Sequence, residues 1–153
     1  MNFIEAIKVC YFKKYWTTNG RCTRSEFWYF LLFYVGVLFF LNFIAPIVQD
    51  LTPQQQFSSK KDWSNFVYIS LFIFSLFSFL PIVSVMTRRL HDINQPGYWV
   101  LVSVVINIIG MTTGQGMIGI LALIIFGMIL ILCIKDGDKK DNEFGKNIYK
   151  KKK

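Results

Sequence analysis

Residues 98–134 read YWVLVSVVINIIGMTTGQGMIGILALIIFGMILILCI and contain no Asp, Glu, Lys, Arg or His. Two more stretches, residues 27–49 and 66–87, are equally free of these side chains. A charged side chain at the centre of a bilayer costs about 2.5–3.5 kcal/mol on insertion scales, so membrane spans exclude charge unless function requires it. The pattern therefore predicts an all-α membrane protein whose charged residues all lie outside the bilayer.

Four transmembrane helices in two hairpins are the predicted architecture. A single helix over residues 98–134 would be about 55 Å long, whereas the hydrocarbon core measures about 30 Å. The glycines between Gly110 and Gly116 are therefore predicted to break this stretch into a tight hairpin. The predicted spans are residues 27–48, 66–86, 98–111 and 117–134.

The distribution of basic residues predicts the orientation of these spans. With four spans, the N-terminal segment, the connection at 87–97 and the C-terminal tail lie on one side, together with 15 of the 17 Lys and Arg residues. The opposite side keeps only Lys60 and Lys61, in a polar connection over residues 49–65. The positive-inside rule then predicts a multi-pass protein with both termini in the cytoplasm. Residues 1–149 would form one membrane domain, followed by a basic tail at residues 150–153.

Residues 2–16 are predicted to form an amphipathic, interfacial N-terminal helix. Phe3, Ile7, Tyr11 and Tyr15 recur at four-residue spacing and so share one helix face. This face can lie on the membrane surface, where neighbouring lysines reach lipid phosphates, or it can pack on the protein's own spans. The spacing alone leaves both arrangements open.

The composition argues against several classes of function. Three cysteines without CxxC spacing suggest neither a disulfide framework nor a zinc site, and no metal or cofactor is expected. The lysine-rich tail comes without a groove-reading motif, so nucleic acid is not an expected partner. The spans contain no carboxylate or lysine of the kind that proton-coupled transporters use.

Two polar segments next to the predicted spans contain the candidate functional residues. The first, GRCTRSEFW at 20–28, has Thr23 and Glu26 at capping-box spacing, which predicts that both satisfy free amides where the first span begins. The second, RRLHDINQPGYW at 88–99, contains the chain's single histidine and a turn that leads back into the membrane. The candidate cluster, completed by one asparagine of the tail, is Arg21, Arg24, Glu26, Arg88, Arg89, His91, Asp92 and Asn142.

Three motifs, in this order around four apolar spans, resemble a known family. They are Gly20-Arg21-x-x-Arg24-x-Glu26-Phe27-Trp28, then Arg88-Arg89-Leu90-His91-Asp92 with Pro96-Gly97-Tyr98-Trp99, and finally Asp136-Gly137 with Asn142-x-Phe144-Gly145. The chain thereby resembles the bacterial inner-membrane family catalogued as domain of unknown function 805, over about residues 3–149. The resemblance implies an integral protein of the bacterial inner membrane and implies no particular activity.

Three hypotheses of function follow from these residues. In the leading one, the motifs meet on the cytoplasmic face and form an arginine cluster that contacts anionic lipid headgroups or a partner protein, with a homo-oligomer as a further possibility. In the second, His91 and Asp92 perform acid–base chemistry on a lipid phosphate, although no nucleophile is recognisable. In the third, Asn42 and Asn107 line a small channel or transporter.

Overall fold

The computed structural model describes the backbone of residues 1–51, 60–114 and 116–149, and every regular element in these ranges is a helix. The described helices are α1 (Phe3–Lys8), the π-helix η1 (Val9–Lys13), α2 (Arg24–Leu51), α3 (Lys60–Asp92), α4 (Tyr98–Thr113) and α5 (Gly116–Ile134). The all-α prediction is confirmed for these residues. Helices α2 and α3 continue into the predicted 49–65 connection, whose centre lies outside the described residues.

Three of these helices contain segments long and apolar enough to cross a bilayer: Arg24–Ile44, Phe66–Asp92 and Gly116–Ile134. The apolar part of α4, Tyr98–Gly110, is shorter and spans about 20 Å at the usual helical rise. The chain is thus a helical membrane protein, and the count of four crossings stays a prediction.

The break between α4 and α5 lies later in the chain than predicted. Gly110 was expected to interrupt the helix, but it lies inside α4, which continues to Thr113. The chain instead leaves the helix at Gly114, whose φ of 66° is the left-handed conformation that favours glycine at a helix end. Gly110 has another role, because a Cβ atom there would lie 3.2 Å from the backbone nitrogen of Gly119. It allows α4 and α5 to approach closely.

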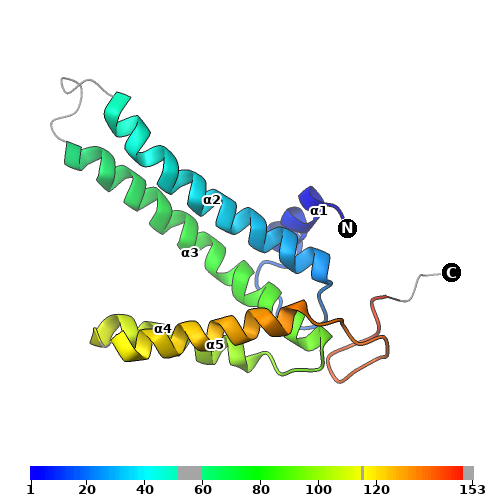
Figure 1. The fold of residues 1–153 in the computed structure, drawn as a ribbon. Coiled ribbons are helices and arrows are strands. Elements are labelled where there is room, and N and C mark those ends of the chain that lie inside the picture. The colour runs from blue at the N-terminus through cyan, green and yellow to red at the C-terminus, as the bar shows by residue number, and fades with distance from the viewer. Residues whose placement is uncertain (52–59, 115, 150–153) are drawn as a thin grey trace.

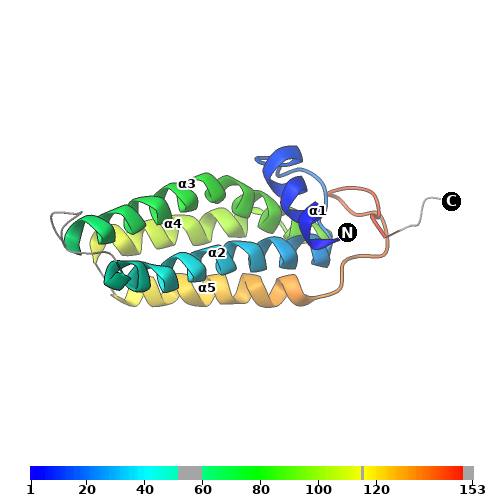
Figure 2. The same cartoon turned by 90° about the horizontal axis from the view of Figure 1, so that it is seen from above.

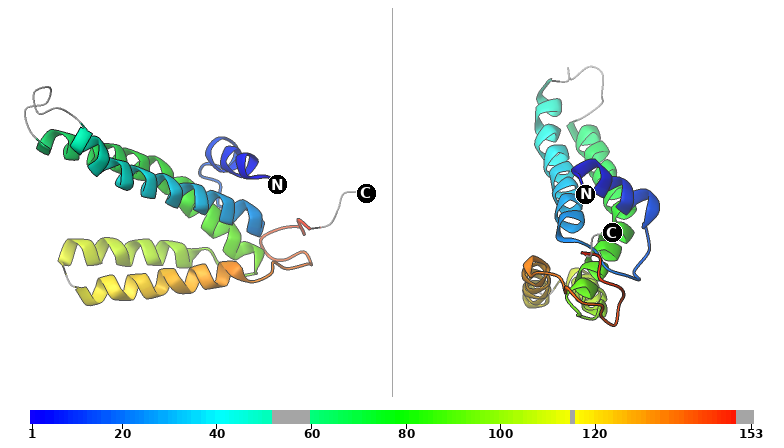
Figure 3. Two further views of the ribbon diagram at one scale, coloured as in Figure 1. Left: turned by 45° about the horizontal axis from the view of Figure 1, so that its top comes forward. Right: turned by 90° about the vertical axis from the view of Figure 1, so that its right-hand side faces the viewer.

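The helices form two hairpins that diverge from one end of the molecule. Helices α2 and α3 pack along each other in the first arm, and α4 and α5 do so in the second (Figure 1). The arms lie close where α2 begins, α3 ends and α5 ends, and they separate toward the opposite end (Figure 3, left). Contacts between the two arms run through α3, which meets both α4 and α5, and α3 lies over α4 when viewed from above (Figure 2). An apolar cavity of about 240 Å³ lies between α3, α4 and α5.

The N-terminal segment packs on the first arm. The expected helix over residues 2–16 is instead a short α-helix followed by the π-helical turn, which ends where Lys14 N donates to Val9 O. Tyr11 hydrogen-bonds to Ser78 at 2.7 Å and stacks on Phe77, and the Tyr15 hydroxyl donates to Phe77 O at 2.6 Å. These two members of the predicted stripe therefore contact the protein's own spans.

The buried apolar core lies at the end where the two arms meet. Phe27 and Phe30 of α2, Leu90 of α3, Val100 of α4 and Cys133 of α5 are all 0–1% exposed. Along the arms, by contrast, most large apolar side chains are exposed, as expected for surfaces that face lipid. The relative position of the two hairpins is therefore fixed at this end.

Candidate functional site

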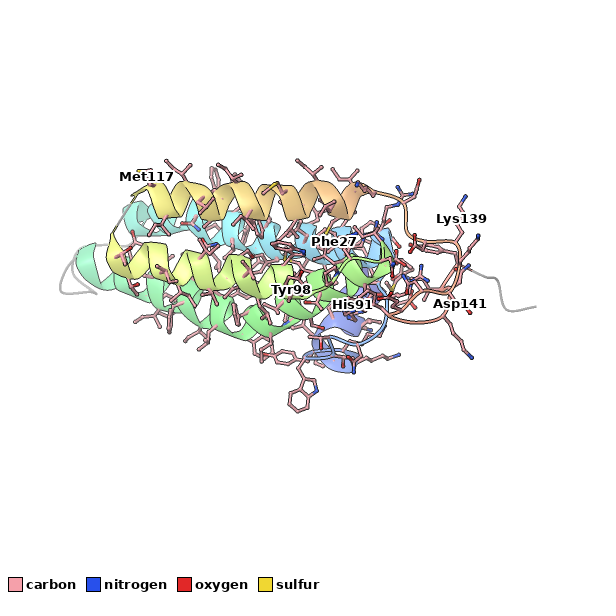
Figure 4. All side chains as sticks on the ribbon, turned by 90° about the horizontal axis from the view of Figure 1, so that it is seen from below. Phe27, His91, Tyr98, Met117, Lys139 and Asp141 are labelled. Carbon is pink, nitrogen blue, oxygen red and sulfur yellow. The ribbon has the colours of Figure 1, made fainter. Side chains whose placement is uncertain are left out.

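Three segments meet at one end of the molecule, next to the apolar core: residues 20–26, 87–97 and 135–149. We call this region the polar end. Figure 4 shows His91 at the same end of the molecule as the tail residues Lys139 and Asp141, whereas Met117 lies at the other end of α5. The predicted cluster residues all lie in this region. The structure thus brings together residues that are more than a hundred positions apart in the sequence.

Two arginines share one carboxylate at the centre of the polar end. Arg21 Nε lies 2.9 Å from Asp92 Oδ1, and Arg89 Nη1 contacts Asp92 Oδ2. All three side chains are at most 1% exposed. Removing a charge from water is expensive, so a buried carboxylate of this kind needs its cationic partners. Because Arg21 comes from the segment before α2 and the other two from α3, this group ties two parts of the chain together.

Arg89 also binds the end of α5. Its Nε donates to Cys133 O at 3.1 Å, and its Nη2 donates to Lys135 O. The last carbonyls of a helix have no partner within the helix and carry its partial negative charge, so a guanidinium is well suited to this position. Through Arg89, the second arm is fastened to the first.

A second buried ion pair joins α3 to the start of α2. Arg88 Nη1 lies 2.5 Å from Glu26 Oε1, and the two side chains are 0% and 7% exposed. The predicted capping box is therefore half correct: Thr23 Oγ1 accepts from Glu26 N at 3.2 Å, but the Glu26 carboxylate pairs with Arg88. The sequence spacing did not reveal this competing partner.

Arg24 differs from the other arginines of the cluster. Its side chain is 52% exposed and pairs with Asp136, 77% exposed, at 2.6 Å. Such a pair, screened by solvent, contributes little to stability. Of the four predicted arginines, Arg24 alone presents its guanidinium at the surface.

His91 is held by packing and by a backbone carbonyl. Its Nδ1 hydrogen-bonds to Gly20 O at 3.2 Å, and its ring stacks on Phe144 with the centroids 4.0 Å apart. The oxygens of the adjacent Asp92 engage Arg21, Arg89 and Tyr149. The two residues proposed as an acid–base pair therefore have different partners, which favours a structural role for His91.

The tail folds back across the polar end as a strap, defined here as residues 135–149. Asp138 N donates to Asp92 O at 2.8 Å, and Arg21 donates to the carbonyls of Asp138 and Lys140. Asn142 Nδ2 donates to His91 O at 2.9 Å, so this asparagine contacts the backbone of α3 next to Asp92. The strap thus covers Arg21 and Arg89 with its backbone.

Tyr149, the last residue of the strap, contacts the carboxylate of Asp92. Its hydroxyl donates to Asp92 Oδ2 at 2.5 Å, although 42% of the residue is exposed. Burial, followed by the hydrogen bond and charge of Asp92, raises the pKa of Tyr149 to about 12. The protonated hydroxyl is therefore the form that this site favours.

Two glycines at the polar end are required by close packing. A Cβ atom on Gly97 would lie 2.2 Å from Thr87 Cγ2 and 3.0 Å from His91 Nε2. A Cβ atom on Gly137 would lie 2.0 Å from Asp92 Oδ2. Gly97 allows the turn into α4 to cross α3, and Gly137 allows the strap to reach Asp92.

The cysteines nearest the cluster are buried thiols. Burial raises the pKa of Cys10 to about 11, although the neighbouring Arg88 guanidinium opposes this shift. Burial likewise raises the pKa of Cys22 well above its usual value. Since the thiolate is the reactive form, these thiols are poor nucleophiles. Among the described residues, no group of three or more His, Cys, Asp or Glu side chains forms a metal site.

The polar residues proposed to line a channel bond within their own helices. Asn42 Nδ2 donates to Leu38 O at 2.8 Å, and Asn107 Nδ2 donates to Ser103 O at 2.9 Å. Asn107 lines the cavity between the arms, whose other lining residues are apolar except for Ser103. These contacts stabilise individual helices and do not form a polar path across the membrane.

The fold and the site define a small helical membrane protein whose hairpins are joined by a buried arginine–carboxylate cluster. Comparison with known families gives a match over residues 15–146 to the family described as Protein of unknown function (DUF805). The chain belongs to this family, which confirms the resemblance carried by the three motifs.

Two curated relatives are inner membrane proteins. "Inner membrane protein YhaI" of Escherichia coli (strain K12) is 32% identical over 89 residues, which are 58% of this chain and 63% of the relative. The protein of the same name from Escherichia coli O157:H7 gives the same identity and coverage. The chain therefore matches slightly under two thirds of the length of these relatives. No solved structure matches the chain.

Proposed function

We propose that this protein is a non-enzymatic membrane module whose N-terminal segment binds anionic lipid headgroups on the cytoplasmic face. Both termini lie in the cytoplasm in this proposal. Its support is the charge distribution: Lys8, Lys13, Arg24 and the described lysines of the tail are all exposed near one end of the molecule. The positive-inside rule assigns such an end to the cytoplasm.

The observation that carries the proposal is the outer face of the N-terminal segment. Phe12 and Trp16 are 82% and 80% exposed and lie outside the candidate spans. Their inner-facing neighbours Tyr11 and Tyr15 fix the segment to α3, so this aromatic pair is held beside the transmembrane hairpin. Trp concentrates at membrane interfaces, where its apolar ring and its polar N–H are both satisfied, and an exposed Phe on the same segment adds apolar surface that lipid can cover.

Exposed lysines on the same segment supply the preference for anionic lipid. Lys8 lies four residues before Phe12, Lys13 lies directly after it, and both lysines are exposed. A basic residue close to an anionic surface contributes about 1 kcal/mol to membrane binding. In this proposal the buried arginines of the cluster hold the two hairpins together, and Arg24 is the cluster member that can reach headgroups directly.

Native mass spectrometry of the protein released from lipid nanodiscs tests this function. Phosphatidylglycerol should be retained in preference to phosphatidylcholine, and Lys8→Gln/Lys13→Gln should abolish most of that preference. The matched control is Lys135→Gln/Lys146→Gln, which removes the same charge from exposed tail lysines. Equal losses in both variants would show attraction by net charge alone. Retention of a protein in place of lipid would favour the partner-binding alternative.

A further inference from the structure

The strap covers three N–H donors of the arginine cluster with backbone carbonyls. Arg21 Nη1 donates to Lys140 O at 2.8 Å, Arg21 Nη2 donates to Asp138 O, and Arg89 Nη2 donates to Lys135 O. These donors belong to two guanidinium groups that flank the same carboxylate. Two neighbouring arginines that both donate to one short segment resemble the paired guanidinium groups that proteins use to bind phosphate.

The charges in this group do not balance. Arg21 and Arg89 carry two positive charges, and Asp92, between them, carries one negative charge. The strap carbonyls satisfy the hydrogen bonds but supply only dipoles. A buried net charge is unfavourable unless it is paired. The group therefore has an excess of one positive charge, which matches the single negative charge of a phosphodiester.

We propose that the strap is a removable cover over an anion site formed by Arg21 and Arg89, and that the ligand is a phosphate group with a net negative charge, such as a phosphodiester that carries no cation of its own. In the open state, phosphate oxygens accept from the donors that now bind the strap carbonyls, while Asp92 holds the two guanidinium groups in place. This site goes beyond the proposed function, which uses the exposed residues of the N-terminal segment.

The structure of the strap is compatible with its moving away from the arginine cluster. Its residues form no helix and only one isolated bridge, between Asn142 and Gly145. It follows the end of α5, so it can move away without unwinding a span. Its side-chain contacts with the rest of the cluster are few: Tyr149 with Asp92, Phe144 with His91, Asn142 with His91 O, and the exposed pair of Asp136 with Arg24. Surface segments with few buried contacts open at low free-energy cost.

Hydrogen exchange at the Asp138 amide reports directly on this cover, because that amide donates to Asp92 O. We expect the amide to exchange at least about tenfold faster in phosphatidylglycerol nanodiscs than in phosphatidylcholine nanodiscs. Adding inorganic phosphate to the phosphatidylcholine discs separates the two sources of the anion. Opening by phosphate alone indicates a soluble ligand, and opening by phosphatidylglycerol alone indicates a lipid headgroup. Unchanged exchange under both conditions overturns the proposal.

Gly137→Ala tests the same site from the protein side. The added methyl group collides with Asp92 and with the Tyr149 hydroxyl, so it should displace the strap and increase phosphatidylglycerol retention about tenfold. Gly36→Ala is the matched control, since nothing lies within 4 Å of a Cβ atom there. If Gly137→Ala prevents folding, Tyr149→Phe provides a milder opening variant. Faster Asp138 exchange without any gain in retention contradicts the proposal.

The two sites can be separated by the variant used for the proposed function. Lys8→Gln/Lys13→Gln should reduce overall lipid preference but leave lipid-dependent exchange at Asp138 unchanged. Loss of both effects together in that variant would mean that the strap merely follows surface binding, and would exclude a separate site at Arg21 and Arg89.

Discussion

The polar end and the two arms of this protein are stabilised in different ways. At the polar end, charged side chains from two segments are buried against named partners, the strap covers them with its backbone, and glycines permit close contacts. Along the arms, exposed apolar side chains dominate, and the polar residues Asn42 and Asn107 bond to their own helices. Lipid tails are as apolar as the arms, so hydrophobicity alone does not set the position of one hairpin against the other. The difference indicates that the polar end determines the tertiary structure.

The largest expected effect of a single substitution is that of Asp92→Asn. Removing this carboxylate leaves Arg21 and Arg89 buried without a counter-charge, and breaking a buried pair costs about 3–5 kcal/mol. Thermal unfolding in detergent should show a large loss of stability. The control is Asp136→Asn, in which the exposed pair with Arg24 is lost, and its cost should not exceed about 1 kcal/mol. Similar melting temperatures for Asp92→Asn and Asp136→Asn would show that the buried carboxylate contributes no more to stability than the exposed one.

The arms could be predicted from the sequence because their signal is local. A run of residues without charge identifies a span wherever it occurs, and the predicted boundaries fall within or close to the observed helices. The positions of Gly110 and Gly114 could not be assigned, because one helps α4 pack against α5 and the other ends α4. Both uses of glycine look alike in a glycine-rich stretch.

The cluster was predictable in its membership but not in its pairing. The three motifs identified the residues that meet, yet spacing assigned Glu26 to a capping box, whereas the folded chain pairs it with Arg88. Pairing over such sequence distances depends on tertiary structure. The sequence analysis also missed Tyr149 and the carbonyls of the strap, since backbone acceptors leave no signature in a sequence. A lone tyrosine in a lysine-rich tail was the signal available.

Gly97→Ala tests whether close packing at the polar end matters as much as charge. The methyl group would overlap Thr87 Cγ2, and overpacking of a buried site costs about 1–3 kcal/mol. The measurement is the same thermal unfolding, with Gly127→Ala as a control, because a Cβ atom there meets nothing within 4 Å. Combining Gly97→Ala with Thr87→Ser, which removes the nearest methyl group, should recover part of the stability. If the double variant is as unstable as Gly97→Ala alone, overlap with Thr87 Cγ2 is not the cause of the lost stability.

Tyr149→Phe sharpens the role of the strap. The substitution removes one hydrogen bond to the Asp92 carboxylate and keeps the ring, so a loss of about 1 kcal/mol is expected. Chemical denaturation of the two proteins side by side measures it. In the Asp92→Asn background, the same substitution should cost much less, because the charged acceptor is absent. Additive losses would show that the tyrosine acts through another contact.

The raised pKa of Tyr149 predicts a dependence of stability on pH. A pKa raised from 10.0 to about 12 in the folded state means that folding favours the protonated hydroxyl. The stabilising contribution is therefore complete below pH 10 and is lost as the pH rises from 10 to 12. The difference in stability between the wild type and Tyr149→Phe should shrink across this window. A constant difference would indicate that the hydroxyl ionises at its usual pKa.

The smallest effect is expected in the arms, where Asn42→Leu removes a polar side chain from α2. This asparagine is exposed and donates to Leu38 O four residues earlier on the same helix. That carbonyl belongs to the regular backbone pattern of α2, and leucine suits a lipid-facing position, so stability should change by less than about 0.5 kcal/mol. The same unfolding assay applies, and Ser78→Ala, which breaks the bond between α3 and Tyr11, serves as the contrast. A cost for Asn42→Leu that equals the cost of Ser78→Ala would mean that Asn42 has a partner outside this chain, and the arms would then contribute to recognition as well as to membrane insertion.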